Sequence, residues 1–278
     1  MQRAISTYLF RHCVLGVHLL DQIARAGIEQ VEIECARAHF DYTNPTHVRE
    51  IAEWFSDSAV RLHSVHAPLS RDPQETTHHA VVSIAFLDRQ RRQDSMDEIK
   101  RALELAEQIP FRYLVLHLGV SGEEFDLRKF DAALTSLEHL RLSAQQRGVE
   151  ILLENISNDL STPHRLLEFF HHTHLRDLKV CFDTGHAQLD GDARNALNLL
   201  AGSIASTHLH DNDGTKDDHR FPFDGVIAWE ELIPKLRRAA PEAPFLLEVR
   251  GEQMGPDLER VIQVFDRFER ILEEKEKP

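Results

Sequence analysis

The chain alternates short apolar runs with longer segments whose apolar residues recur at helical spacing. The runs are rich in leucine and β-branched residues, as in strands buried on both faces of a parallel sheet. They fall near residues 4–10, 31–35, 60–67, 113–119, 150–156, 178–183, 204–210 and 245–250. Strands that alternate with helices in this way predict an α/β fold, a (β/α)₈ TIM barrel formed as a single domain by residues 1–278.

The predicted helices have recognisable ends. Ser95 and Glu98 have the spacing of a capping box, so a helix is expected to begin at Ser95. The long connection over 69–94 is expected either to cover part of the barrel mouth or to be a surface excursion. An open, doubly wound sheet usually has a glycine-rich first turn, and the chain contains no G-x-G-x-x-G motif.

Composition limits the class of protein. The 278 residues carry a net charge of −14, which disfavours a nucleic-acid partner because phosphates would be repelled. No apolar run reaches the ~20 residues that span a bilayer. The N-terminus lacks the apolar stretch of a signal peptide, and the three cysteines are scattered. These features favour a cytoplasmic protein with reduced thiols and a small-molecule partner, and they leave its oligomeric state open.

Four runs end in residues that packing does not explain. Glu154, Asp183, His210 and Glu248 each lie at the carboxyl end of a predicted strand. In a barrel these ends share one rim, so the side chains are expected to converge on a metal ion. Three carboxylates and an imidazole suit Mn²⁺, Mg²⁺ or Co²⁺, with Zn²⁺ also possible. His208, two residues before His210, points to the same side of its strand.

Several motifs together resemble the xylose-isomerase-like barrel superfamily, which contains sugar isomerases, sugar epimerases and endonuclease IV. The motifs are VHAPL at 65–69, LHLG at 116–119, LLEN at 152–155, FDTGH at 182–186, HLHDNDGTKDDHRFPFDGVIAW at 208–229 and LLEV at 246–249. The resemblance implies a metal-dependent isomerase or epimerase of a sugar or sugar derivative. Proton transfer would pass through a metal-stabilised enediolate, with Glu154 and Glu248 as the acid and base.

The resemblance also implies roles for other residues. One divalent ion would bind Glu154, Asp183, Glu248 and a histidine, for which we favour His210 and keep His208 open. The residues expected to contact substrate are His66, His117, His186 and Arg250.

Two other activities stay open. An endonuclease IV-like phosphodiesterase would hold three metal ions with nine ligands. The chain has a candidate at each position: His66, His117, Glu154, Asp183, His186, His208, Asp217, His219 and Glu248. A metal-dependent dehydratase or lyase on a polyol or keto acid is the other alternative.

Overall fold

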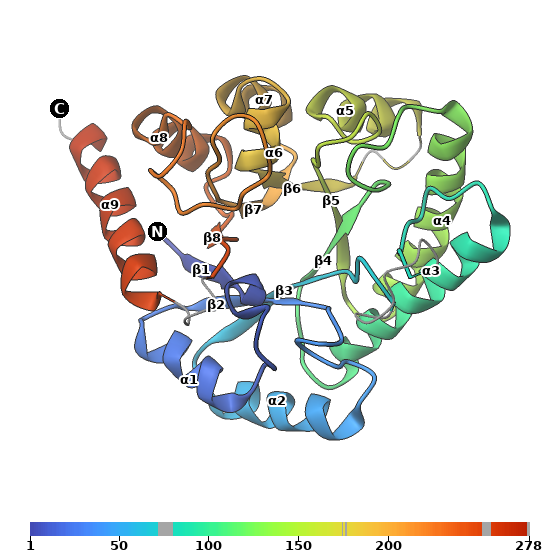
Figure 1. The fold of residues 1–278 in the computed structure, drawn as a ribbon, viewed down its shortest axis with the longest axis horizontal. Coiled ribbons are helices and arrows are strands. Elements are labelled where there is room, and N and C mark those ends of the chain that lie inside the picture. Colours follow the sequence, from blue (N-terminus) through green and yellow to red (C-terminus); the bar gives the residue numbers. More distant parts are fainter. Residues whose placement is uncertain (72–79, 174, 176, 252–256, 277–278) are drawn as a thin grey trace.

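Eight parallel strands form the centre of the molecule, and helices surround them (Figure 1). The structure is a computed structural model that describes residues 1–71, 80–173, 175, 177–251 and 257–276. The strands are β1 (Arg3–Ser6), β2 (Gln30–Glu34), β3 (Arg61–His66), β4 (Tyr113–His117), β5 (Glu150–Glu154), β6 (Lys179–Asp183), β7 (Ile204–His208) and β8 (Phe245–Leu247).

The strands follow one another around a ring. Each of β1 to β6 pairs with the next strand along the chain, and β8 pairs with β1. An isolated parallel bridge between Leu209 and Leu247 links the segment after β7 to β8. The predicted (β/α)₈ barrel is therefore confirmed. Its register matters for the chemistry, because His117 lies opposite Glu154 and Asp183 lies opposite His208 at the carboxyl ends.

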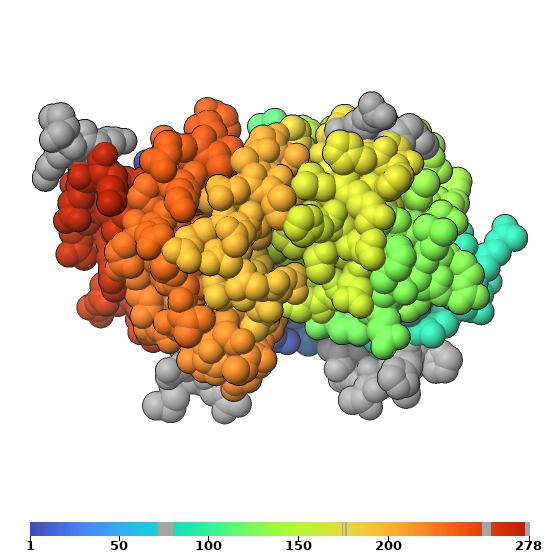
Figure 2. All heavy atoms as spheres, turned by 90° about the horizontal axis from the view of Figure 1, so that it is seen from above, coloured from blue at the N-terminus to red at the C-terminus, as the bar shows by residue number. Residues whose placement is uncertain are grey.

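The helices cover the outside of the barrel in chain order. They are α1 (Val17–Arg25), α2 (Pro45–Asp57), α3 (Arg89–Leu103), α4 (Leu127–Gln145), α5 (Pro163–His172), α6 (Thr184–Leu189), α7 (Ala193–Leu200), α8 (Trp229–Ala239) and α9 (Leu258–Glu276), with 3₁₀ turns η1 (Thr7–Phe10) and η2 (Glu104–Glu107). Seen from above, the segments from green through yellow and orange to the red C-terminal helix follow one another along one side (Figure 2). No described helix is long and apolar enough to cross a membrane.

Apolar side chains fill the layer between strands and helices. Inside the barrel, a smaller apolar cluster is formed by Tyr113, Val115, Leu152 and Cys181. Side chains alternate along a strand, so the inward-facing residues two positions after Leu152 and Cys181 are Glu154 and Asp183. The apolar cluster therefore fills the barrel interior one layer before Glu154 and Asp183, on the side away from the carboxyl ends of the strands.

Two predicted boundaries were wrong. Helix α3 begins at Arg89, not at Ser95, because the Asp88 side chain accepts the Arg91 backbone N–H at 2.8 Å and caps the helix earlier. The Ser95 hydroxyl instead donates to the Arg91 carbonyl at 2.8 Å, within the helix. The first strand ends at Ser6, and the 3₁₀ turn η1 follows it. Of the long connection, residues 72–79 lie outside the described part of the chain.

Candidate metal and active site

A cavity of about 330 Å³ opens at the carboxyl ends of the strands. Its polar lining comes from strands and loops on several sides of the barrel. The polar and charged side chains of this lining include Tyr8, Arg11, Glu34, His66, His117, Glu154, His186, Asp217, His219 and Glu248. This is the end of the barrel at which (β/α)₈ enzymes place their chemistry.

The central group consists of Glu154, Asp183, His208 and Glu248, which offer ligand atoms within 4.8 Å of one another. His208 Nδ1 lies 3.3 Å from Glu154 Oε1 and 3.4 Å from Glu248 Oε2. Asp183 Oδ2 is 4.0 Å from the same nitrogen. All four side chains are buried, so the group is a carboxylate-rich centre with one imidazole.

A second group shares Glu154 with the first. His66 Nε2 lies 3.3 Å, and His117 Nε2 3.1 Å, from Glu154 Oε2. His66 Nδ1 donates to the carbonyl oxygen of Ala67 at 2.9 Å, which directs Nε2 at the group. Glu154 therefore has histidine nitrogens beside both oxygens, because Oε1 faces His208 and also lies 3.4 Å from His186 Nδ1.

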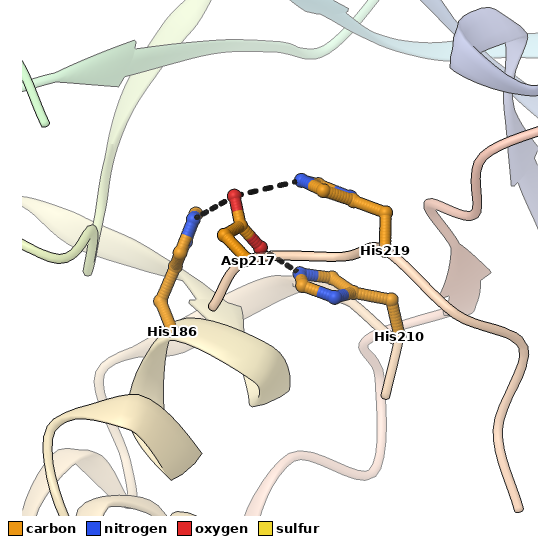
Figure 3. A group of neighbouring side chains, drawn as sticks. All are labelled: His186, His210, Asp217 and His219. Carbon is orange, nitrogen blue, oxygen red and sulfur yellow. Dashed lines mark hydrogen bonds and ion pairs between the residues drawn. The ribbon is translucent and has the colours of Figure 1, made fainter. Parts of the chain in front are cut away.

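A third group lies above the strand ends and is formed by His186, His210, Asp217 and His219 (Figure 3). Asp217 Oδ2 is 3.2 Å from His186 Nε2 and 3.1 Å from His219 Nε2. The rings of His210 and His219 stack with centroids 3.9 Å apart. His219 Nδ1 donates to the Glu248 carbonyl oxygen at 2.9 Å, so its Nε2 faces Asp217.

The motif FDTGH at 182–186 brings the group around Asp217 into contact with the central group. Asp183 caps α6 by accepting the His186 backbone N–H at 2.7 Å, while its other oxygen lies 2.9 Å from His210 Nε2. Gly185 allows this close approach, since a Cβ there would come within 2.0 Å of the His210 ring. Asn155 fixes the neighbouring strand end through two hydrogen bonds with the Asp183 backbone, of 2.8 and 2.9 Å.

The loop between β7 and α8 is held by buried Asp211. Its Oδ2 accepts the Trp229 indole N–H at 2.7 Å, and its Oδ1 accepts the Ile227 backbone N–H at 3.2 Å. Gly225 packs so closely that a Cβ would lie 2.1 Å from the Asn212 carbonyl oxygen. Asp211 and Trp229 of the long motif therefore shape the loop that carries Asp217.

The buried carboxylates and histidines of the site strongly shift one another's pKa values. Burial alone would lower the pKa of His66 and His219, but the carboxylates beside them raise each to about 9. Burial alone would raise the pKa of Glu154, yet His208 and His117 hold it well below its ordinary value. Burial dominates at Glu248 and raises its pKa to about 7. Without a cation, protonated imidazoles therefore supply the positive charge that balances the carboxylates.

The residues fit a divalent metal ion. His208 Nδ1 and His186 Nδ1 are buried without a hydrogen-bond partner in the described structure, although carboxylate oxygens surround both atoms. Unpaired buried polar atoms are costly, and a cation bound among them would satisfy the nitrogen lone pairs. Carboxylates with imidazole form the ligand set preferred by Mn²⁺ and also found at zinc sites.

The structure separates the two histidines of the H-x-H pair. His208, the last residue of β7, belongs to the central group, whereas His210 lies beyond the strand end beside Asp183 and Asp217. His208 is thus the histidine of the four-residue group, whereas His210, the histidine favoured from the sequence, lies 2.9 Å from Asp183 and belongs to the group around Asp217. Which of the two binds an ion stays a prediction.

The expected substrate residues fall into two sets. His66, His117 and His186 line the cavity, whereas Arg250 is exposed and is not among the described lining residues. Tyr8 and Arg11 are among the lining residues that the sequence analysis missed. Both follow the early end of β1, a turn that the apolar run over 4–10 concealed.

Comparison with known proteins agrees with the fold. A family model described as xylose isomerase-like TIM barrel matches residues 20–271. The uncharacterized protein y4fM of Sinorhizobium fredii is 26% identical, covering 83% of this chain and 80% of that protein. A D-tagatose 3-epimerase-like protein has a TM-score of 0.80 at 22% identity, with 99% of each chain covered. The IolI protein with a bound zinc atom has a TM-score of 0.78 at 17% identity, with 100% of each chain covered.

Proposed function

The chain belongs to the xylose isomerase-like TIM barrel family, and we propose that it is a divalent-metal-dependent isomerase or epimerase of a sugar or sugar derivative. One observation carries the proposal: Glu154 and Glu248 lie in the same buried group and both line one small cavity. Isomerisation and epimerisation next to a carbonyl need a group that removes a proton and a group that returns it. Two carboxylates at one cavity supply such a pair.

The residues divide the work as follows. Glu154, Asp183, His208 and Glu248 would hold the ion, which when bound supplies positive charge that stabilises the negative charge developing on the substrate carbonyl. Glu248 would accept the proton from the carbon next to the carbonyl, and Glu154 would return one. The buried histidines around the cavity, His66, His117 and His186, would orient the substrate hydroxyls.

The size and charge of the site support a small substrate. A cavity of about 330 Å³ is at the lower end of the range for small-molecule pockets. The net charge of −14 opposes long polyanions, and the two similar structures described above include a D-tagatose 3-epimerase-like protein. A hydroxylated carbonyl compound of sugar size matches these features.

The test is solvent-hydrogen exchange. The full-length protein, loaded with Mn²⁺, is incubated in D₂O with a panel of ketoses and aldoses, and carbon-bound deuterium is followed by NMR and mass spectrometry. A substrate should gain deuterium at the carbon next to its carbonyl and yield its isomer or epimer. Chelation with EDTA should abolish exchange, and Glu154→Gln and Glu248→Gln should each slow it by roughly 10²–10⁴-fold.

The outcomes separate the chemistries. Turnover without exchange would contradict proton transfer and favour a hydride shift. Loss of water from the substrate would favour a dehydratase. No turnover of any sugar, with metal bound, would contradict the proposal.

A second candidate is a phosphodiesterase with up to three metal ions. The observation that favours it is the position of Glu154, whose two oxygens face histidines of different groups. A carboxylate between two ions would act as a bridge and would have no free oxygen to serve as a base. Three ions per chain by elemental analysis, together with hydrolysis of bis(p-nitrophenyl) phosphate, would favour this candidate over the isomerase.

A further inference from the structure

A buried carboxylate lies on the far side of His208 from the central group. Glu32, on β2, is fully buried, and its Oε1 is 2.9 Å from His208 Nε2. Its other oxygen accepts the Ser64 hydroxyl at 2.7 Å. Glu32 does not line the cavity, so substrate would not touch it.

The two ring nitrogens of His208 therefore face different partners. Nε2 faces Glu32, whereas Nδ1 faces Glu154 and Glu248. Neither nitrogen makes a hydrogen bond in the described part of the chain, so the contact between Nε2 and Glu32 is an ion pair that a small rotation of the ring or the carboxylate would turn into a hydrogen bond. A neutral imidazole carries one proton, and a carboxylate that accepts it at Nε2 leaves the Nδ1 lone pair for a cation.

This arrangement differs from that of two neighbouring histidines. His66 and His219 each donate from Nδ1 to a backbone carbonyl, which leaves Nε2 directed at their groups. For His208 the orientation is reversed, and a side chain takes the place of the carbonyl. A side chain can be replaced by mutation, whereas a backbone carbonyl cannot, so this contact can be tested directly.

One other group lies near the ring. The Cys181 thiol is also buried beside this ring. A thiol sulfur is a weak hydrogen-bond acceptor, whereas Glu32 offers a carboxylate oxygen 2.9 Å from Nε2. The carboxylate is thus the stronger acceptor for the His208 Nε2–H.

We propose that Glu32 is a positioning residue that holds the proton of His208 on Nε2 and so directs Nδ1 at the divalent ion. This inference rests on the metal site of the proposed function. Loss of a carboxylate that orients a metal-bound histidine typically costs about 10–100-fold in metal affinity.

The experiment measures Zn²⁺ affinity of the metal-free, full-length protein by competition with a chromophoric chelator. Glu32→Ala should weaken binding by about 10–100-fold, and Glu32→Gln should weaken it less, because the amide oxygen still accepts the Nε2–H. Glu98→Gln is the matched control. Glu98 is also fully buried and ion-paired, to Arg37 and Arg101, but it lies on α3. This variant should bind Zn²⁺ like the wild type even if it is less stable.

A second measurement needs no variant at Glu32. Long-range ¹H–¹⁵N correlation spectra of the Zn²⁺-loaded wild type report which ring nitrogen carries the proton, with His208→Gln used to assign the signal. We expect the proton on Nε2. A proton on Nδ1, or equal affinity in wild type, Glu32→Ala and Glu32→Gln, would overturn the role of Glu32. Failure of the wild type to bind any metal would instead overturn the proposed function on which this inference rests.

Discussion

At the scale of single residues, the position of His208 determines which atoms can meet at the site. It is the last residue of β7, and its ring is enclosed by carboxylates from β2, from β5 and from the end of β8. These charges raise its pKa well above the ordinary value, although burial alone would lower it. The metal-free protein therefore holds a proton at neutral pH where the proposed ion would bind.

This proton predicts a pH dependence of metal binding. Below its raised pKa, His208 is protonated in the metal-free protein, so binding of an ion must expel that proton. Mn²⁺ affinity should rise with pH from 6 to 8, by up to about tenfold per unit for the His208 proton and more steeply below pH 7, where Glu248 with its pKa of about 7 must also lose a proton. Calorimetry in buffers of different ionisation enthalpy would count the protons.

The proton count also separates the two candidate functions. At pH 8, where Glu248 with its pKa of about 7 is already ionised, release of about one proton fits one ion in the central group. Release of further protons, from His66 and His219 with pKa values of about 9, would fit three ions. An affinity that does not change between pH 6 and 8 would contradict His208 as a ligand.

At the scale of elements, the junction between β6 and α6 connects the central group with the group around Asp217. Asp183 ends the strand and caps the helix, so the same carboxylate fixes the helix start and faces His210. Gly185, in the first turn of α6, leaves room for the His210 ring. The geometry of the proposed metal site therefore depends on the close packing of this turn.

The packing at this junction predicts that adding one methyl group at Gly185 lowers the free energy of unfolding. Gly185→Ala would place a Cβ 2.0 Å from the His210 ring, which must move. Overpacking of this kind typically costs about 1–3 kcal/mol, measurable by urea unfolding of the metal-free protein. Gly16→Ala is the control, because its Cβ would meet only the His18 side chain, at 3.1 Å. Equal stability of the two variants would contradict a tightly packed junction.

Elements differ in how well the sequence predicts them. The strands could be predicted, because burial on both faces leaves continuous apolar runs such as EILLE and KVCFD. The start of α3 could not, since Asp88 and Ser95 both precede acceptable helical sequences and the sequence alone does not show that the Asp88 side chain caps the helix. Cavity residues Tyr8 and Arg11 were hidden because an apolar run does not show where a strand becomes a 3₁₀ turn.

At the scale of the whole molecule, the barrel brings together residues that are far apart in the sequence. Glu32 and Glu248 are more than two hundred positions apart, yet both lie within 3.4 Å of the His208 ring. Strand ends could be predicted to converge, because parallel strands of a barrel share one rim. That His208 lies beside Glu154 and Glu248 while His210 contacts Asp183 could not be predicted, because both histidines point to the same side and differ only in their position along the chain.

The most direct test of the central claim is anomalous diffraction at the manganese edge from crystals of the full-length protein grown with Mn²⁺. The account predicts a peak at bonding distance from His208 Nδ1 and from carboxylate oxygens of Glu154, Asp183 and Glu248. The peak should be absent in Asp183→Ala. Further peaks beside His66 or Asp217 would favour the three-ion phosphodiesterase. Absence of a peak in the central group of the wild-type protein would contradict the account.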